Sequence, residues 1–123
     1  MIRINPKYEE LFNPRNIDDD CEKIADLMSA EASFIREALD AGIFKQAVTM
    51  YLQLLKSMTN HFVEDEHFCY FDDLYGPEYV LQGLYEDIQM HDLDFESCAL
   101  LKEGHDEIMQ SECYENYGYP SYL

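Results

Sequence analysis

Apolar residues recur at helical spacing between residues 18 and 41. Their separations of 4-3-4-3-4 place one apolar stripe on a helix of about 3.6 residues per turn. The stripe consists of Cys21, Ala25, Met28, Ala32, Ile35 and Leu39. Asp19 followed three residues later by Glu22 is typical of a capping box at a helix start. Gly42 suits the helix end, because glycine enters the left-handed region without strain.

The same spacing recurs in residues 43–63 and predicts a second long helix. Its stripe consists of Phe44, Val48, Tyr51, Leu55, Met58 and Phe62. Ala47, Leu52 and Leu54 widen the stripe, which is typical of a helix covered on more than one side. Since only a turn around Gly42 separates the two helices, we expect an antiparallel hairpin.

Two further helices are expected in the second half of the chain. The first covers 77–90, with Pro77 at its first position, where a missing N–H costs nothing. Its predicted face is Tyr79, Val80, Leu84 and Ile88, and Gly83 is a weak point. The second covers about 93–114, capped by Asp92 or Asp94, with a face made of Phe95, Cys98, Leu101, His105 and Ile108, and Met109 as a further candidate.

No segment shows the alternation typical of a strand, so the predicted fold is all-α. We expect a compact bundle of about four helices built on the antiparallel hairpin. The predicted organisation is an extended leader (1–17), from which Tyr8, Leu11 and Phe12 can pack onto the bundle, a helical domain (18–114) and a tyrosine-rich tail (115–123). Residues 64–76, which alternate acids with aromatics, are expected to form a loop.

Charge divides the chain into two unequal halves. The net charge is −18, and residues 57–123 hold sixteen acidic residues against a single basic one. Such a field repels nucleic-acid phosphates and anionic lipid headgroups, so direct binding to either is not expected. A basic protein partner, a cation or simple solubility remain as explanations.

The cysteines favour a reducing compartment, and the lack of a long apolar run argues against a membrane span. Cys21, Cys69, Cys98 and Cys113 form no C-x-x-C pair, and no signal-peptide pattern precedes them. No apolar run approaches the roughly 18 residues that a membrane span needs. We therefore expect a cytoplasmic protein without a membrane span.

The hairpin junction resembles a tetratricopeptide-type helix pair. Gly42, Phe44, Ala47 and Tyr51 follow the pattern G-x-aromatic-x-x-A-x-x-x-aromatic, and the resemblance covers residues 24–58. It implies protein binding in a concave groove, which in that family requires several stacked repeats. A second repeat 34 residues later would place Leu81 where alanine belongs, so only one pair fits the pattern. Ordinary helix packing is the alternative explanation.

A second resemblance covers a longer span. A helical pair, an acidic loop with Asp72, Asp73 and Gly76, and further helices resemble the helical region that follows the zinc finger in SWIM zinc-finger proteins. The finger itself needs C-x-C and C-x-H pairs, and the chain has neither. The resemblance therefore implies a helical interaction region without zinc or nucleic-acid function.

Two clusters in the sequence contain residue types that can bind a metal ion. His61, Glu64 and His67 form H-x-x-E-x-x-H, but three residues at this spacing spread around a helix instead of converging. His91, Asp92, Asp94 and Glu96 offer ligands but lack the glycine and length of a calcium loop. A solvated acidic surface is the expected outcome, and no cofactor or metal is predicted.

No catalytic motif is recognisable, so an enzyme is not expected. The chain lacks G-x-S-x-G, phosphate-loop, dinucleotide and H-E-x-x-H patterns. His105 falls in an apolar stripe, where a hydrogen-bonded core histidine is the expected role. Cys69 adjoins several carboxylates, which raise a thiol pKa and oppose nucleophilic use.

Our leading hypothesis is a non-enzymatic protein-interaction domain. Tyrosine is favoured at interfaces because it brings a large amphipathic area at low entropic cost. The predicted contact surface combines the acidic aromatic loop with the tail, and a basic protein is one candidate partner. Its residues are Phe68, Tyr70, Phe71, Asp72, Asp73, Tyr75, Tyr79, Tyr117, Tyr119 and Tyr122. Alternatively, the tail packs back onto the bundle.

Two rival functions stay open at this stage. The first is an acidic nucleic-acid mimic that inhibits a DNA-binding protein, and the second is a carboxylate/histidine metal-binding bundle. A monomer and a homodimer are both compatible with the sequence, the dimer if an apolar face stays uncovered.

Overall fold

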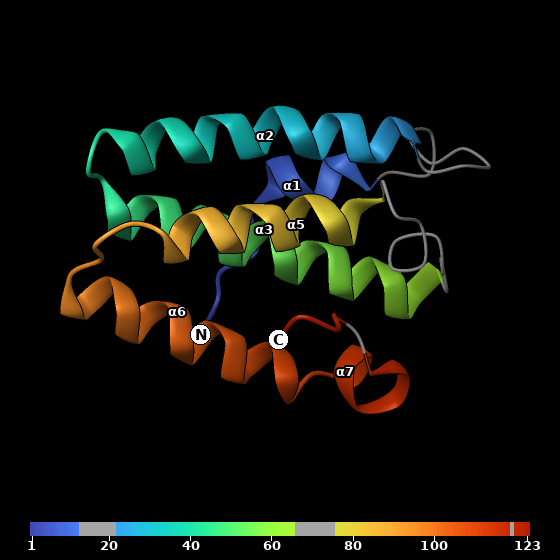
Figure 1. Ribbon diagram of the computed structural model, residues 1–123. Helices are drawn as coiled ribbons and strands as arrows, with labels where there is room; N and C mark the ends of the chain where they lie inside the picture. The colour runs from blue at the N-terminus through green and yellow to red at the C-terminus, as the bar shows by residue number, and fades with distance from the viewer. Residues whose placement is uncertain (13–21, 66–75, 119) are drawn as a thin grey trace.

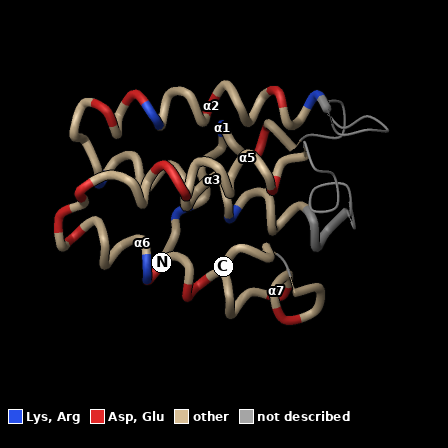
Figure 2. Tube along the Cα trace, in the orientation of Figure 1, with Lys and Arg blue, Asp and Glu red and all other residues tan. Residues whose placement is uncertain are grey.

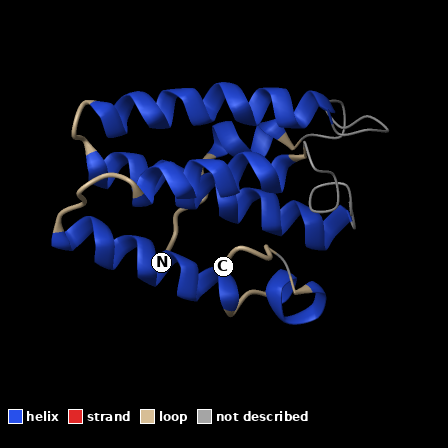
Figure 3. Ribbon diagram, viewed as in Figure 1, coloured by secondary structure: helices blue, strands red, loops and turns tan. Residues whose placement is uncertain are grey.

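The computed structural model describes residues 1–12, 22–65, 76–118 and 120–123, which form helices joined by turns and loops (Figure 3). The helices are α1 (Pro6–Leu11), α2 (Glu22–Asp40), α3 (Phe44–Asp65), α5 (Pro77–Gln89), α6 (Phe95–Met109) and α7 (Glu112–Tyr117). The predicted all-α fold is therefore confirmed. None of these helices has the length and apolar character needed to cross a membrane.

Helix α3 lies at the centre of the bundle. It contacts each of the other helices that the structure describes. Figure 1 shows α2 running antiparallel to α3, and α5 followed by α6 as a second antiparallel pair. α2 also packs against α5, whereas α6 is held mainly by α3. This arrangement confirms the hairpin-based bundle.

The turn between α2 and α3 forms as the sequence predicts. Gly42 has φ of 79°, in the left-handed region. Its N–H donates to the carbonyl of Leu39 at 3.0 Å, and the N–H of Ile43 donates to that of Ala38 at 2.9 Å. These two bonds define a Schellman motif, which satisfies carbonyls left without partners at the helix end.

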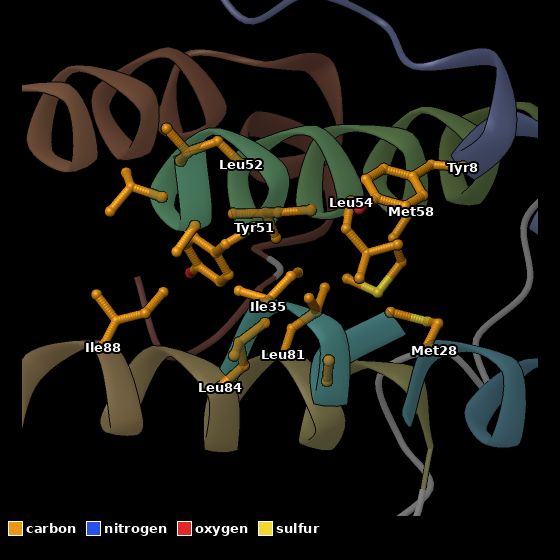
Figure 4. Packing of buried hydrophobic residues seen from close by; sticks show 14 of the residues in the cluster. Tyr8, Met28, Ile35, Tyr51, Leu52, Leu54, Met58, Leu81, Leu84 and Ile88 are labelled. Atoms are coloured by element: carbon orange, nitrogen blue, oxygen red, sulfur yellow. The ribbon is translucent and has the colours of Figure 1, made fainter. Parts of the chain in front are cut away.

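The core consists of the predicted stripes of α2 and α3, joined by α5. Ala25, Met28, Ala32, Ile35 and Leu39 of α2 are buried, as are Ala47, Val48, Tyr51, Leu52, Leu54, Leu55 and Met58 of α3. Figure 4 shows Ile35 close to Leu81 and Leu84 of α5. The predicted helix start at Asp19 and the packing of Cys21 and Phe62 lie outside what the structure describes.

The prediction of an extended leader is wrong for residues 6–11. Asn5 caps α1, because its side chain accepts a hydrogen bond from the N–H of Lys7 at 3.0 Å. Pro6 then occupies the first turn, where its fixed φ suits a helix. Tyr8 and Phe12 are buried in the core, so this segment does pack on the bundle as expected.

The predicted fourth helix, 93–114, is two helices. Asp94 caps α6 as proposed, accepting from the N–H of Ser97. The helix ends at Met109 because Ser111 adopts an extended conformation and caps α7 with its own hydroxyl, which accepts from the N–H of Tyr114. Gly118, with φ of 73°, then ends α7.

The predicted face of α6 is only partly correct, because Ile108 is buried and Leu101 packs against the core, but its first two residues are not buried. Phe95 and Cys98 are exposed, whereas Ser97, Gly104 and Ile108 are buried. A Cβ atom on Gly104 would lie 2.4 Å from the Leu52 side chain, so the missing side chain lets α6 approach α3 closely. Small residues rather than the apolar stripe therefore set the orientation of α6. Tyr79 of α5, predicted on a packing face, is likewise exposed.

Candidate functional site

Three large apolar side chains are exposed at one end of the bundle. Ile43 in the α2–α3 turn is 50% exposed, Met90 after α5 is 84% exposed and Phe95 at the start of α6 is 86% exposed. Figure 1 places the α2–α3 turn and the α5–α6 loop at the same end. We call Ile43, Met90 and Phe95 the apolar end patch. Apolar side chains gathered in this way mark a binding surface more often than isolated ones do.

His91 joins the two segments that carry this patch. Its ring lies 6.0 Å from the ring of Phe44, centroid to centroid, and its Nε2 lies 3.4 Å from Oδ1 of Asp40. Its Nδ1 lies 2.8 Å from the carbonyl oxygen of Asp87, to which an Nδ1–H donates. That bond, with the nearby carboxylate of Asp40, raises the pKa of His91. The loop is therefore fixed against the turn.

Exposed carboxylates occur in the same segments as the apolar end patch. Asp40 precedes the turn, and Asp92, Asp94 and Glu96 are all exposed around the start of α6. Figure 2 shows these acids gathered at this end of the bundle. Hydrogen bonds from Ser97 lower the pKa of Asp94, so this carboxylate stays ionised. The site combines exposed apolar side chains with exposed carboxylates close to them in the sequence.

Most of the predicted contact residues lie outside the residues that the structure describes. These are Phe68, Tyr70, Phe71, Asp72, Asp73, Tyr75 and Tyr119. Tyr79 is described and is 50% exposed, near the start of α5. It lies at the end of the bundle opposite the apolar end patch (Figure 1). The structure does not bring it together with the patch.

The tail packs back onto the helices, which was the second alternative considered for it. The hydroxyl of Tyr122 lies 3.0 Å from that of Tyr51, which is fully buried. Tyr117 is half-buried against the core. Tyr122 is therefore engaged inside the molecule instead of forming part of an open tyrosine surface.

His105 is a hydrogen-bonded packing residue, as the sequence suggested. Its Nε2 lies 2.7 Å from the hydroxyl of Tyr51, and its ring packs 4.8 Å from that of Tyr85. Burial lowers the pKa of His105 to about 4, so the ring is neutral at pH 7. A neutral ring lets Tyr122 donate to Tyr51 and Tyr51 donate to Nε2, which satisfies all three groups.

Among the described residues, the remaining candidates for a catalytic or metal-binding role are Cys113 and His61, and neither forms a reactive site. Cys113 is buried, and its pKa is raised to about 12 by that burial, so its thiol is not ionised at pH 7. His61 binds Glu9, with 2.7 Å between Nε2 and Oε2. His67, Cys69 and the side chain of Glu64 lie outside the description. No group of three or more potential ligands that could hold a metal ion occurs in the described part of the chain.

Sequence reasoning missed all three residues of the apolar end patch. The spacing to Cys98 and Leu101 predicts a buried position for Phe95, but the residue is exposed. The Asp94 cap was the available signal, because it fixes Phe95 as the first residue of α6, at the very end of the helix. Ile43 and Met90 follow the ends of α2 and α5, where no periodic pattern reports on exposure.

No known protein family, curated protein or solved structure matches this chain. The resemblances to a tetratricopeptide-type helix pair and to the helical region of SWIM proteins therefore stay predictions. Function has to be argued from the residues themselves.

Proposed function

We propose that this protein is a non-enzymatic interaction domain whose apolar end patch binds a basic, amphipathic segment of a partner protein. The observation that carries the proposal is the exposure of Met90 and Phe95 in a stretch of chain that also carries the exposed carboxylates of Asp92, Asp94 and Glu96. Large apolar residues supply most of the binding energy at interfaces, while charges on the rim set specificity and association rate.

The negative charge of the site favours a partner with basic side chains. Asp40, Asp92, Asp94 and Glu96 would repel an acidic segment and attract lysine or arginine side chains. An amphipathic helix offers an apolar face for the patch and basic residues for the carboxylates. The fixed contact of His91 with the turn favours binding without a large rearrangement.

A cytoplasmic location belongs to the same proposal. Cys98 is a free thiol, which is compatible with a reducing compartment. Tyr79, from the predicted contact surface, stays a separate candidate contact near the start of α5, at the other end of the bundle. The binding experiment below distinguishes the two ends.

The test measures binding of a synthetic 18-residue peptide (about five helical turns) of leucine and lysine, with all leucines on one helical face. Fluorescence anisotropy would give its affinity for the wild type, for the double variant Met90→Ser/Phe95→Ser and for Tyr79→Ser. We expect the double variant to raise Kd about tenfold or more, because two apolar anchors are lost. Tyr79→Ser is the matched control and should leave Kd unchanged.

Two results would overturn the proposal. Loss of binding in Tyr79→Ser but not in the double variant would assign the contact to the opposite end of the bundle. Equal binding of a peptide with the same composition in scrambled order, abolished steeply by salt, would show that carboxylates act alone. That second result would favour the nucleic-acid mimic.

A further inference from the structure

An open groove runs between α5 and α6. Both helices lie on α3, and between them is a pocket of about 560 Å³, lined by Tyr85 and Gln89 of α5, by Leu101, His105 and Met109 of α6, and by Leu123. The presence of Leu123 in this lining shows that the last described segment, Pro120–Leu123, reaches into the groove. Figure 1 shows that segment returning between the two helices.

Two side chains anchor this segment. Ser121 donates from its N–H and its hydroxyl to Oε1 of Glu78, at 2.7 and 2.8 Å, and Glu78 is buried in the first turn of α5. The hydroxyl of Tyr122 meets that of Tyr51. The ring of Tyr122 also packs 5.7 Å from that of Tyr85, centroid to centroid. The groove therefore recognises a hydroxyl residue, a tyrosine and an aliphatic residue in succession.

The contacts between Pro120–Leu123 and the bundle resemble those of a bound peptide. Among the described residues, Pro120–Leu123 makes only one hydrogen bond between two main-chain groups. It is internal, from the N–H of Leu123 to the carbonyl of Pro120. Its link to the bundle follows the left-handed cap at Gly118. Ordering four residues costs conformational entropy, which opposes the hydrogen bonds of Ser121 and Tyr122 and the packing of Tyr122 and Leu123 against the core. Release would also expose Glu78 to water, which solvates a carboxylate well.

We propose that the α5–α6 groove is a peptide-binding site, occupied within the chain by Pro120–Leu123, and that a partner segment with a tyrosine followed by an aliphatic residue exchanges with it. This site goes beyond the proposed function, because its lining contains none of the three residues of the apolar end patch, although His91 and Asp92 beside the patch also line it. The incoming tyrosine would use the Tyr51 hydroxyl, and the aliphatic residue would enter the pocket between Leu101 and Met109.

The test uses the full chain and a peptide of residues 117–123, Tyr-Gly-Tyr-Pro-Ser-Tyr-Leu with an acetylated N-terminus. The double variant Ser121→Ala/Tyr122→Ala weakens the internal occupant. We expect this variant to bind the peptide at least tenfold more tightly than the wild type does, with the His105 ring signals shifting in an NMR titration. The matched control peptide, with alanine at the position of Tyr122, should not bind. Failure of the folded variant to bind, or equal binding of the control peptide, would overturn the proposal.

A second measurement on the wild type covers the case in which the variant does not fold. Hydrogen exchange of the Ser121 amide reports release of the segment, because that N–H donates to Glu78. We expect it to exchange at least a hundredfold faster than the core amides of α3, such as that of Leu55, through local opening. If the Ser121 amide exchanges only at the rate of global unfolding, the segment is a fixed part of the fold and the proposal fails.

Discussion

Helices α2 and α6 both pack on α3, but they bury different kinds of side chain. α2 places a continuous apolar stripe from Ala25 to Leu39 in the core. α6 buries Ser97 and Gly104 together with Ile108, and leaves Phe95 exposed. Polar contacts add to the attachment of α6, including the ion pair of 2.9 Å between Lys56 and Glu107.

The difference assigns separate roles to the two helices. α2 buries most of its large apolar side chains in the core, with Phe34 as the exposed exception among its described residues. α6 is attached through close backbone approach, which leaves Phe95 for the end patch and Leu101 and Met109 for the groove. Both proposed binding sites therefore lie along α6.

The largest expected effect comes from the buried stripe of α2. Ile35→Ala should lower the free energy of unfolding by about 3 kcal/mol, because a fully buried side chain is replaced by a cavity. Its neighbour Phe34 is 56% exposed, with Lys7 over its ring at 5.6 Å. Phe34→Ala should therefore cost less than about 1 kcal/mol. Urea unfolding followed by circular dichroism measures both, and equal losses would contradict the assigned face.

A glycine comparison tests the close approach of α6. A Cβ atom at Gly83 of α5 would meet only Arg36, at 3.7 Å, so Gly83→Ala should raise the free energy of unfolding by about 0.5–1 kcal/mol through helix propensity. Gly104→Ala gains the same propensity but forces Leu52 to move within a packed core. Gly104→Ala should therefore be about 2 kcal/mol less stable than Gly83→Ala in the same urea assay. Equal stability of the two variants would show that α6 does not depend on a small residue there.

The same contrast explains what could be predicted from the sequence. The stripes of α2 and α3 were predictable because large apolar residues at regular spacing have one way to be buried. The turn at Gly42 was predictable because it needs a residue that tolerates the left-handed backbone conformation. On α6 the apolar pattern predicted Leu101 and Ile108 correctly but not Phe95 and Cys98. Gly104 and Ser97 carry no hydrophobic signal, and the close contact with Leu52 exists only in three dimensions.

The candidate sites were less predictable than the fold. Met90 and Phe95 form a patch because the α5–α6 loop lies against the α2–α3 turn, a long-range contact that no local motif encodes. The return of Tyr122 to Tyr51 spans 71 residues and was one of two open alternatives. Asn5 and Pro6 did carry a start signal for α1, but six residues are too few for a periodic pattern.

The smallest expected effect is a difference in pH dependence between the attachments of the two helices. The predicted stripe of α2 contains no ionisable group in the described residues, whereas the face of α6 includes His105, whose pKa burial lowers to about 4. A lowered pKa in the folded state means that the unfolded chain binds the proton more tightly. The His105 contribution is therefore complete above pH 6.5 and is lost as pH falls towards 4.

Replacing His105 isolates this contribution from the titrating carboxylates. Between pH 7 and pH 4 the wild type should lose about 1–2 kcal/mol more stability than His105→Gln, after allowance for solvent reaching the ring. His91→Gln is the control with the opposite pH dependence, because the pKa of His91 is raised in the folded state. Protonated His91 stabilises the fold at low pH, and that contribution is lost as pH rises above 6.5. Urea unfolding at matched ionic strength measures both variants. Parallel stability curves for the wild type and His105→Gln would mean that α6 attaches to α3 independently of the histidine ring.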